Sequence, residues 1–225
     1  MSARDTVLAT VRRSLGVDGR EPARQLAVKA RIGQHARGIV PKRGNGPPAA
    51  RLKLFTEMMQ AVHGTVVRVA TYEDVPAAVA DYLRGKNLPM EIRRGADPRL
   101  KNIPWRNEGA LDVALGPSRG NDLTAVSHAF AAVAESGTLV LLSGVDNPTT
   151  LNFLPDHHLV IVDAADIAGD YETVWDKLRE VYGLGGMPRT VNFITGPSRS
   201  GDIEQVHLLG AHGPRSLHVL VVGKA

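Results

Sequence analysis

A loop rich in glycine and serine near the C-terminus carries the residue types that bind small anions. Residues 196–202 read Gly-Pro-Ser-Arg-Ser-Gly-Asp and follow the apolar run 191–194, which we expect to be a β-strand. The residues from 203 onward resemble a helix start, and Asp202 with Gln205 fits a capping arrangement. A loop between a strand and a helix N-terminus offers free backbone N–H groups and the positive end of the helix dipole, which together favour an anion.

The side chains of this loop add to the same expectation. Two serines supply hydroxyl donors, and Arg199 can pair with a carboxylate or a phosphate. An ordinary strand-to-helix turn with a capping aspartate is the alternative, because the loop matches neither the P-loop pattern nor the dinucleotide fingerprint. The candidate ligand-binding residues of this region are Gly196, Ser198, Arg199, Ser200, Asp202, Glu204 and His212.

A second candidate lies at residues 134–138, Ala-Glu-Ser-Gly-Thr, directly before the apolar run 138–142. A carboxylate beside a buried strand is partly desolvated, which suits acid–base or nucleophilic chemistry. Glu135 is therefore the candidate catalytic residue, and Ser136, Gly137 and Thr138 are candidate ligand-binding neighbours. The alternative is a hairpin turn whose glutamate faces water.

The sequence gives no sign of a metal or a cofactor. His207 and His212 lie near Asp202 and Glu204, but their spacing matches no zinc pattern, so we expect no metal. His212 precedes a Gly-Pro turn and is interpreted as a hydrogen-bonding partner of a ligand or as a buried structural histidine. The absence of cysteine excludes disulfides, thiol catalysis and cysteine-ligated iron–sulfur clusters within this chain. No flavin or nicotinamide fingerprint is visible, and no cofactor is predicted.

The composition is that of a globular protein with one sizeable core. Hydrophobic residues make up 43% and charged residues 22% of the 225 residues, whereas aromatic residues make up only 4%, so we expect a core of Val, Leu, Ile and Ala. No apolar run reaches the roughly 18–20 residues that a membrane span needs. The first segment is predicted to be a short amphipathic helix rather than an apolar signal core. We expect a cytoplasmic protein.

Basic residues are concentrated at the N-terminus. Residues 1–50 hold ten Lys and Arg against three acidic residues, a net charge of +7, so the rest of the chain carries −3 of the total of +4. A helix is expected over residues 2–15, and residues 17–48 are rich in Gly, Pro and basic residues, which predicts an extended arm. The arm could be a solvated tail or could dock an acidic partner subunit. Nucleic-acid binding is disfavoured, because the arm has no aromatic residue to stack on bases.

The remaining chain alternates apolar runs with helical patterns, which predicts an α/β domain over residues 49–225 after a basic N-terminal helix and arm over residues 1–48. Because the strands are continuous apolar runs, we expect a mostly parallel sheet with helices on both faces. Ligands of such sheets bind outside the carboxyl ends of the strands. The expected helices are 50–62, 74–83, 171–182 and a short one from 202, and the expected strands are 65–70, 90–93, 111–115, 138–142, 159–162, 191–194 and 217–222. Residues 125–134 suit a helix or a strand equally well.

Two stretches of the sequence resemble the signatures of the LUD-domain family. Residues 195–204, continuing through Gly-Ala-His-Gly-Pro at 210–214 to 217–219, are similar to one signature. Residues 134–141, Ala-Glu-Ser-Gly-Thr-Leu-Val-Leu, are similar to the second, in which the residue after Glu is usually Thr. The signatures stand in the family's order about sixty residues apart, and the resemblance covers roughly residues 50–223. Residues 17–48 lie outside both signatures.

The resemblance implies a fold and a functional setting. The family's best-known members act in lactate utilisation, and its cysteine-rich type carries iron–sulfur clusters. This short, cysteine-free chain is similar to the other, C type. A subunit of a system that oxidises L-lactate to pyruvate is implied, with iron–sulfur clusters in partner subunits. The family's fold is that of CoA transferases, ribose-phosphate isomerase and glucosamine-phosphate deaminase, and Glu135 is similar in context to the covalent carboxylate of some CoA transferases, a likeness at the level of the fold.

Three functions follow as hypotheses. The first is a non-redox subunit of an L-lactate oxidation system, which binds a small carboxylate or phosphate or docks iron–sulfur partner subunits. The second is a stand-alone enzyme, similar to a CoA transferase or a sugar-phosphate isomerase, that uses Glu135. The third is a nucleic-acid or regulatory partner that acts through the basic arm. The first accounts for both signatures and for the missing cysteines.

Overall fold

The computed structural model describes residues 2–183, 185–203 and 206–224. It divides the chain into two compact units, residues 1–39 and residues 40–225. The larger unit contains every candidate residue named above and is called the body below.

The N-terminal unit consists of two helices, α1 (Ala3–Leu15) and α2 (Pro22–Gln34). The start of α1 is a capping box between Ser2 and Asp5, and Gly16 ends it in the left-handed conformation. The expectation of an extended arm over residues 17–48 was wrong at α2. Pro22 fixes the backbone at the first helical position, and strong helix formers such as Ala, Arg, Gln and Leu follow it. The glycines and prolines that suggested an arm are concentrated after this helix.

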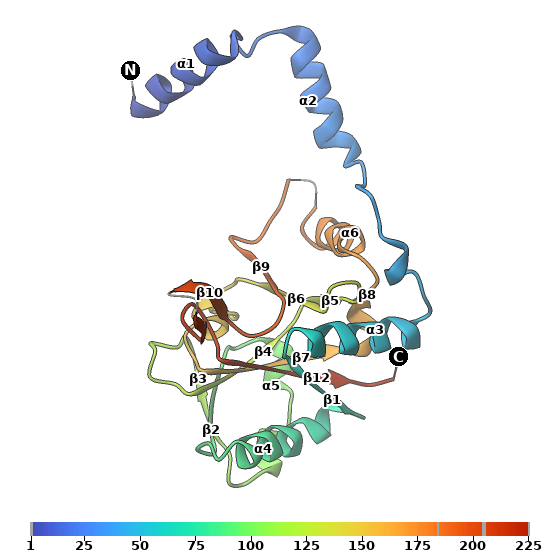
Figure 1. Ribbon diagram of the computed structural model, residues 1–225, viewed down its shortest axis with the longest axis vertical. Helices are drawn as coiled ribbons and strands as arrows, with labels where there is room; N and C mark the ends of the chain where they lie inside the picture. The colour runs from blue at the N-terminus through green and yellow to red at the C-terminus, as the bar shows by residue number, and fades with distance from the viewer. Residues whose placement is uncertain (1, 184, 204–205, 225) are drawn as a thin grey trace. The chain divides into compact units, whose positions relative to one another are not determined.

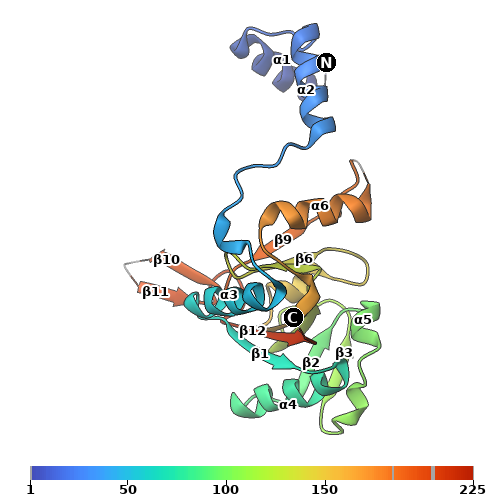
Figure 2. The ribbon, with the colours of Figure 1, turned by 90° about the vertical axis from the view of Figure 1, so that its right-hand side faces the viewer.

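The body is built on a six-stranded sheet in which every pair of neighbours is parallel, as Figures 1 and 2 show. The strands, from one edge to the other, are β1 (Thr65–Val69), β12 (Ser216–Val222), β7 (His157–Asp163), β4 (Thr124–His128), β2 (Glu91–Arg94) and β3 (Asp112–Leu115). The prediction of a mostly parallel α/β sheet with helices on both faces is confirmed.

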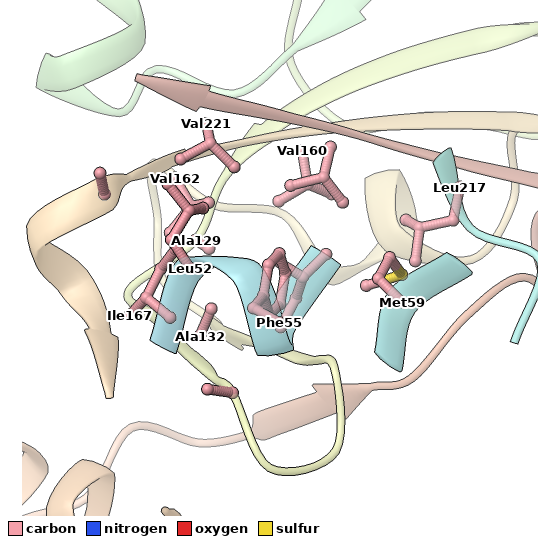
Figure 3. Packing of buried hydrophobic residues seen from close by; sticks show 14 of the residues in the cluster. Leu52, Phe55, Met59, Ala129, Ala132, Val160, Val162, Ile167, Leu217 and Val221 are labelled. Carbon is pink, nitrogen blue, oxygen red and sulfur yellow. The ribbon is translucent and has the colours of Figure 1, made fainter. Parts of the chain in front are cut away.

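One face of this sheet packs against α3 (Pro48–Ala61). Phe55 and Met59 of this helix are fully buried against Val160, Leu217 and their neighbours from the central strands, as Figure 3 shows. The short 3-10 turn Lys42–Gly44 precedes α3 and lies against the backbone of Gly169. Truncating such a buried side chain costs about 3–5 kcal/mol, so α3 is a main source of the body's stability.

The other face packs against α4 (Val75–Gly85) and α5 (Pro98–Lys101). Val79, Leu83 and Leu100 from these helices are fully buried with Leu159 and Leu220 of the central strands. Short 3-10 turns at Tyr72–Asp74 and Trp105–Asn107 complete this layer. Successive residues of β7 and β12 point to opposite faces of the sheet, so these two strands contribute side chains to the hydrophobic cores on both faces.

A second sheet of four strands lies beyond α3. Its order is β8 (Ile167–Ala168), β5 (Ala131–Val133), β6 (Thr138–Leu142) and β9 (Val191–Ile194), with β5, β6 and β9 antiparallel. α6 (Tyr171–Tyr182) covers its outer face with Val174 and Leu178. The ambiguous residues 125–134 thus form two strands, one in each sheet. Further 3-10 turns are Thr149–Asn152 and Ala164–Asp166.

The helix expected from Asp202 is absent from the structure, and this prediction was wrong. β10 (Arg199–Ile203) pairs antiparallel with β11 (Val206–Leu209), so the segment is a β-hairpin. The four residues Val206, His207, Leu208 and Leu209 fit a strand as well as a helix turn, because so short a segment cannot be assigned by periodicity. Among the described residues, no helix is long and apolar enough to span a membrane.

Candidate functional site

The two sequence motifs meet at the start of β6. Thr138 Oγ1 lies 2.7 Å from Thr195 Oγ1, which joins the stretch around Glu135 to the stretch around Ser198. Ser136 Oγ is 2.7 Å from Thr138 Oγ1 and 2.8 Å from the Tyr171 hydroxyl, which itself lies 2.8 Å from Thr138 Oγ1. We call Ser136, Thr138, Tyr171 and Thr195 the hydroxyl cluster. Its members satisfy one another, and Thr138 is fully buried.

A tight turn at residues 135–137 brings this cluster against α3. Gly137 has a φ of 66°, and a Cβ placed there would lie 2.5 Å from the backbone nitrogen of Met59. The position therefore needs glycine for its conformation and for the close approach of the helix. The stretch is a hairpin turn, since β5 and β6 pair antiparallel across it.

Glu135 nevertheless does not face water, as a hairpin glutamate was expected to do. The residue is 4% exposed, and its N–H donates to the Gly169 carbonyl at 3.2 Å. Its buried Oε2 has no hydrogen-bond partner among the described residues. A buried carboxyl oxygen without a donor is costly, and a catalytic role is one of the explanations for such a group.

The loop that follows β9 uses its polar groups internally. Ser198 N–H donates to the Pro214 carbonyl at 2.8 Å, and Ser198 Oγ accepts from the His212 N–H at 3.2 Å. Gly196 has a φ of 83° and lies against Val62. Arg199 and His212 are exposed. The helix N-terminus that was to favour an anion here does not exist, because β10 and β11 follow the loop.

The structure does not test the rest of this prediction. The side chains of Ser200 and Asp202 lie outside the described part of the chain, as do all atoms of Glu204. Of the predicted site residues, Glu135, Ser136, Gly137 and Thr138 are brought together in one turn, and Gly196, Ser198 and His212 in one loop.

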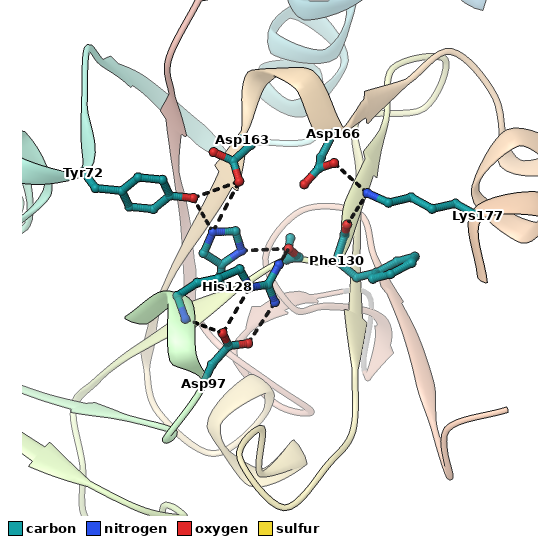
Figure 4. Close-up of polar contacts among 9 residues, drawn as sticks. Tyr72, Asp97, His128, Phe130, Asp163, Asp166 and Lys177 are labelled. Carbon is teal, nitrogen blue, oxygen red and sulfur yellow. Dashed lines mark hydrogen bonds and ion pairs between the residues drawn. The ribbon is translucent and has the colours of Figure 1, made fainter. Parts of the chain in front are cut away.

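A second group of polar residues lies at the carboxyl ends of the central strands (Figure 4). His128 is the last residue of β4, and Asp163 is the last residue of β7. The Tyr72 hydroxyl lies between them, 2.8 Å from His128 Nε2 and 2.8 Å from Asp163 Oδ2. His128 Nδ1 lies 2.8 Å from the carbonyl oxygen of Ala129. Burial lowers the pKa of His128, and the positive charge of Arg99 lowers it further.

Arg99 stands beside this histidine on α5. Its Nε and Nη2 donate to the two carboxylate oxygens of Asp97 at 3.0 and 2.8 Å, and its Nη1 donates to the Ala129 carbonyl at 3.0 Å. Asn147 Nδ2 also donates to Asp97 Oδ2 at 3.0 Å. Burial alone would raise the pKa of Asp97, but the hydrogen bonds and the charge of Arg99 hold it at about 2. We call Tyr72, Asp97, Arg99, His128 and Asp163 the carboxyl-edge network.

A cavity of about 270 Å³ opens beside Arg99 and His128. Lys177 lies close by, where its Nζ donates to Asp166 at 2.6 Å and to the Phe130 carbonyl at 3.1 Å. Its lining combines apolar side chains, among them Phe130, Leu142 and Val181, with polar ones, among them Ser143, Asp146 and Asn147. A concave site in which polar groups converge between apolar side chains has the character of a small-molecule site.

None of these residues was predicted from the sequence as a site residue, although they lie at the carboxyl ends of strands, where ligands of parallel sheets bind. His128 lies in the stretch 125–134 that could not be assigned, and Asp163 follows the predicted strand 159–162 by one residue. Their neighbours Tyr72 and Arg99 come from separate segments and carry no motif. Within the described ranges, no group of three or more His, Cys, Asp or Glu side chains is placed to hold a metal ion.

Comparison with known proteins places this architecture in a family. The LUD domain family matches residues 123–222. The lactate utilization protein C of Bacillus subtilis is 37% identical over 183 residues, which cover 76% of this chain and 74% of that protein. The chain therefore belongs to the LUD-domain family, and the resemblance noted in the sequence is confirmed.

Two further comparisons extend over most of the chain. An uncharacterized protein of Neisseria meningitidis serogroup B is 28% identical over 240 residues, or 99% of this chain and 94% of that one. The crystal structure of a DUF162 family protein from Deinococcus radiodurans superposes with a TM-score of 0.58 at 22% identity, covering 79% of this chain and 99% of that one. Alignments with lactate utilization protein C from several other organisms span less than half of those proteins.

Proposed function

We propose that this protein is a non-redox subunit of an L-lactate oxidation system. The observation that carries the proposal is its 37% identity with a lactate utilization protein C over 74% of that protein's length, which supports a role in lactate utilisation. The chain contains no cysteine, so cysteine-ligated clusters would have to be held by partner subunits. In this role the chain binds a small carboxylate, or a phosphate in its place, and docks the iron–sulfur subunits in the cytoplasm.

The test is dye-coupled oxidation of L-lactate with this chain alone, with its cysteine-rich partner subunits alone, and with the mixture. Activity is expected only in the mixture, because neither this chain nor the cysteine-rich subunits alone would contain all the subunits of the lactate-oxidising system. Equal rates with and without this chain would remove the proposal. A mixture inactive with L-lactate but active with another 2-hydroxy acid would change the substrate and keep the role.

A second candidate is an enzyme that uses Glu135 as a nucleophile or base. The buried Oε2, which has no partner among the described residues, favours this candidate. Glu135→Gln keeps the shape of the side chain and removes the charge, so it is expected to abolish turnover while changing the free energy of unfolding by less than about 1 kcal/mol. Unfolding of this variant in place of inactivation would make Glu135 a structural residue. Full activity of Glu135→Gln in acyl-CoA transfer or sugar-phosphate isomerisation, the reactions of the similar enzymes, would exclude the candidate.

A further inference from the structure

We propose that the cavity at the carboxyl ends of β4 and β7 is a binding site for a short carboxylic acid, with Arg99 as the carboxylate anchor and the His128–Tyr72–Asp163 chain as a proton acceptor coupled to binding. This inference deepens the proposed function, on which it rests for the choice of a carboxylate as ligand.

The anchor follows from the unused donors of Arg99. A guanidinium has five N–H groups, and the contacts with Asp97 and Ala129 use one on each nitrogen. One N–H on Nη1 and one on Nη2 remain without a partner among the described residues. The side chain is 39% exposed and lines the cavity. Because Asp97 holds the guanidinium through Nε and Nη2, a carboxylate can accept hydrogen bonds from the remaining N–H groups of Nη1 and Nη2.

The walls of the cavity suit a small organic acid. Phe130, Leu142 and Val181 provide apolar surface around a volume of about 270 Å³. Ser143 Oγ accepts a hydrogen bond from the Thr190 N–H, and its own hydroxyl proton remains available to a ligand oxygen. The cavity therefore combines the fixed positive charge of Arg99, apolar side chains and a hydroxyl donor. This combination fits a short carboxylic acid better than a sugar phosphate.

The hydrogen bonds around His128 require one proton more than a neutral histidine, a tyrosine and an aspartate carboxylate carry together. The Ala129 carbonyl can only accept, so Nδ1 must carry a proton for the 2.8 Å contact. The single Tyr72 proton can serve either Nε2 or Asp163, but not both 2.8 Å contacts. All three hydrogen bonds are complete only when an extra proton resides on Nε2 or on the Asp163 carboxyl.

The charges around the cavity explain why binding of an anion would favour uptake of that proton by the His128–Tyr72–Asp163 chain. The charged groups that line the cavity or act on His128 are Arg99, which is positive, and Asp97, Asp146 and Asp163, which are negative. Lys177 and Asp166 pair with each other beside Phe130, a residue of the cavity lining. A bound carboxylate adds another negative charge to this excess and offsets the charge of Arg99. Since Arg99 lowers the pKa of His128, its neutralisation favours protonation of the imidazole. The shared Ala129 carbonyl, which accepts from both side chains, holds them beside each other.

The experiment is titration calorimetry of the full chain with pyruvate, with L-lactate and with phosphate as a second anion. At pH 7.5, heats measured in HEPES and in Tris, two buffers without a small anion that could compete for the site, give the number of protons taken up per ligand. We expect saturable binding of pyruvate or L-lactate with net uptake of up to one proton. Binding of phosphate but of neither acid, or uptake of no proton, would overturn the proposal.

Two variants separate the anchor from the proton acceptor. Arg99→Lys keeps the charge but loses the planar pair of donors, and should weaken binding about tenfold. His128→Gln keeps polar contacts but cannot be protonated, so proton uptake should vanish. Arg84→Lys is the matched control, because Arg84 pairs with Asp81 and Glu108 on the surface and should leave affinity unchanged. Thermal melting of each variant identifies loss of folding.

The outcomes distinguish this inference from the function on which it rests. If pyruvate binds with proton uptake but lactate oxidation does not need this chain, the site stands and the subunit role falls. If oxidation needs the chain but Arg99→Lys and His128→Gln bind pyruvate like the unaltered chain, the role stands and this site is wrong.

Discussion

The hydroxyl cluster and the carboxyl-edge network differ in what their polar groups still have to offer. In the hydroxyl cluster, Ser136, Thr138, Tyr171 and Thr195 are hydrogen-bonded to one another, and two family motifs are joined by them. In the carboxyl-edge network, Arg99 keeps donors that no described residue uses, and the single proton of the Tyr72 hydroxyl faces two acceptors, His128 Nε2 and Asp163 Oδ2. Both groups are polar and partly buried, but only the second borders the cavity described above.

A conspicuous motif can thus form a turn and a hydrogen-bonded cluster, while polar groups with unused donors lie in segments that carry no motif. The motif residues are consecutive because a turn and a tight helix contact require consecutive residues. The members of the network come from four separate segments of the chain, which carry Tyr72, Arg99, His128 and Asp163. They lie together because adjacent parallel strands bring distant parts of the chain to one edge of the sheet. The experiments below test whether the two groups really divide the work in this way.

The largest effect is expected at Gly137, where the hydroxyl cluster's turn meets α3. Gly137→Ala would place a Cβ 2.5 Å from the Met59 backbone nitrogen at a φ of 66°, so the turn or the helix must shift. We expect a loss of about 3 kcal/mol or more of unfolding free energy, measured by urea denaturation. Gly120→Ala is the control, because its φ is also positive at 92° but no atom lies within 4 Å of the added Cβ. Equal losses in both variants would show that backbone conformation, and not helix contact, determines the cost.

The carboxyl-edge network should show a pH-dependent stability that the hydroxyl cluster lacks. The pKa of Asp97 is about 2 in the folded protein, below its ordinary value of 3.8, so folding favours the carboxylate. Its contribution, about 2 kcal/mol, is fully present above pH 4 and is lost as the pH falls through 2. The stability advantage of the unaltered chain over Asp97→Asn should therefore shrink between pH 5 and pH 2 in urea denaturation. An advantage that stays constant over this range would mean that Asp97 is not held as a carboxylate by Arg99.

The sequence predicted the body's sheet and helices well, because long apolar runs and the 3.6-residue period of α6 are strong local signals. It failed at the hairpin of β10 and β11, where four residues suit either structure, and at α2, where nearby glycines and prolines obscured a helix. The turn around Glu135 was located, but its burial depends on contacts with α3 and Gly169 that no local pattern reveals. For the same reason Arg99 and Tyr72 were not predicted as site residues, since their contacts arise from the pairing of strands that are distant in the sequence.

The smallest effect is expected from the buried hydroxyl of Thr138, and its value lies in the contrast with another threonine. Thr138→Val removes a hydroxyl that contacts Ser136, Tyr171 and Thr195, although Ser136 and Tyr171 still reach each other. We expect a loss of about 1 kcal/mol of unfolding free energy, with pyruvate binding and proton uptake unchanged. Thr124 is equally buried at 2% exposure, but its Oγ1 has no partner among the described residues, so Thr124→Val should be neutral or slightly stabilising. A Thr138→Val variant that folds normally but loses pyruvate binding would place the ligand at the hydroxyl cluster and reverse the division of roles between the two regions.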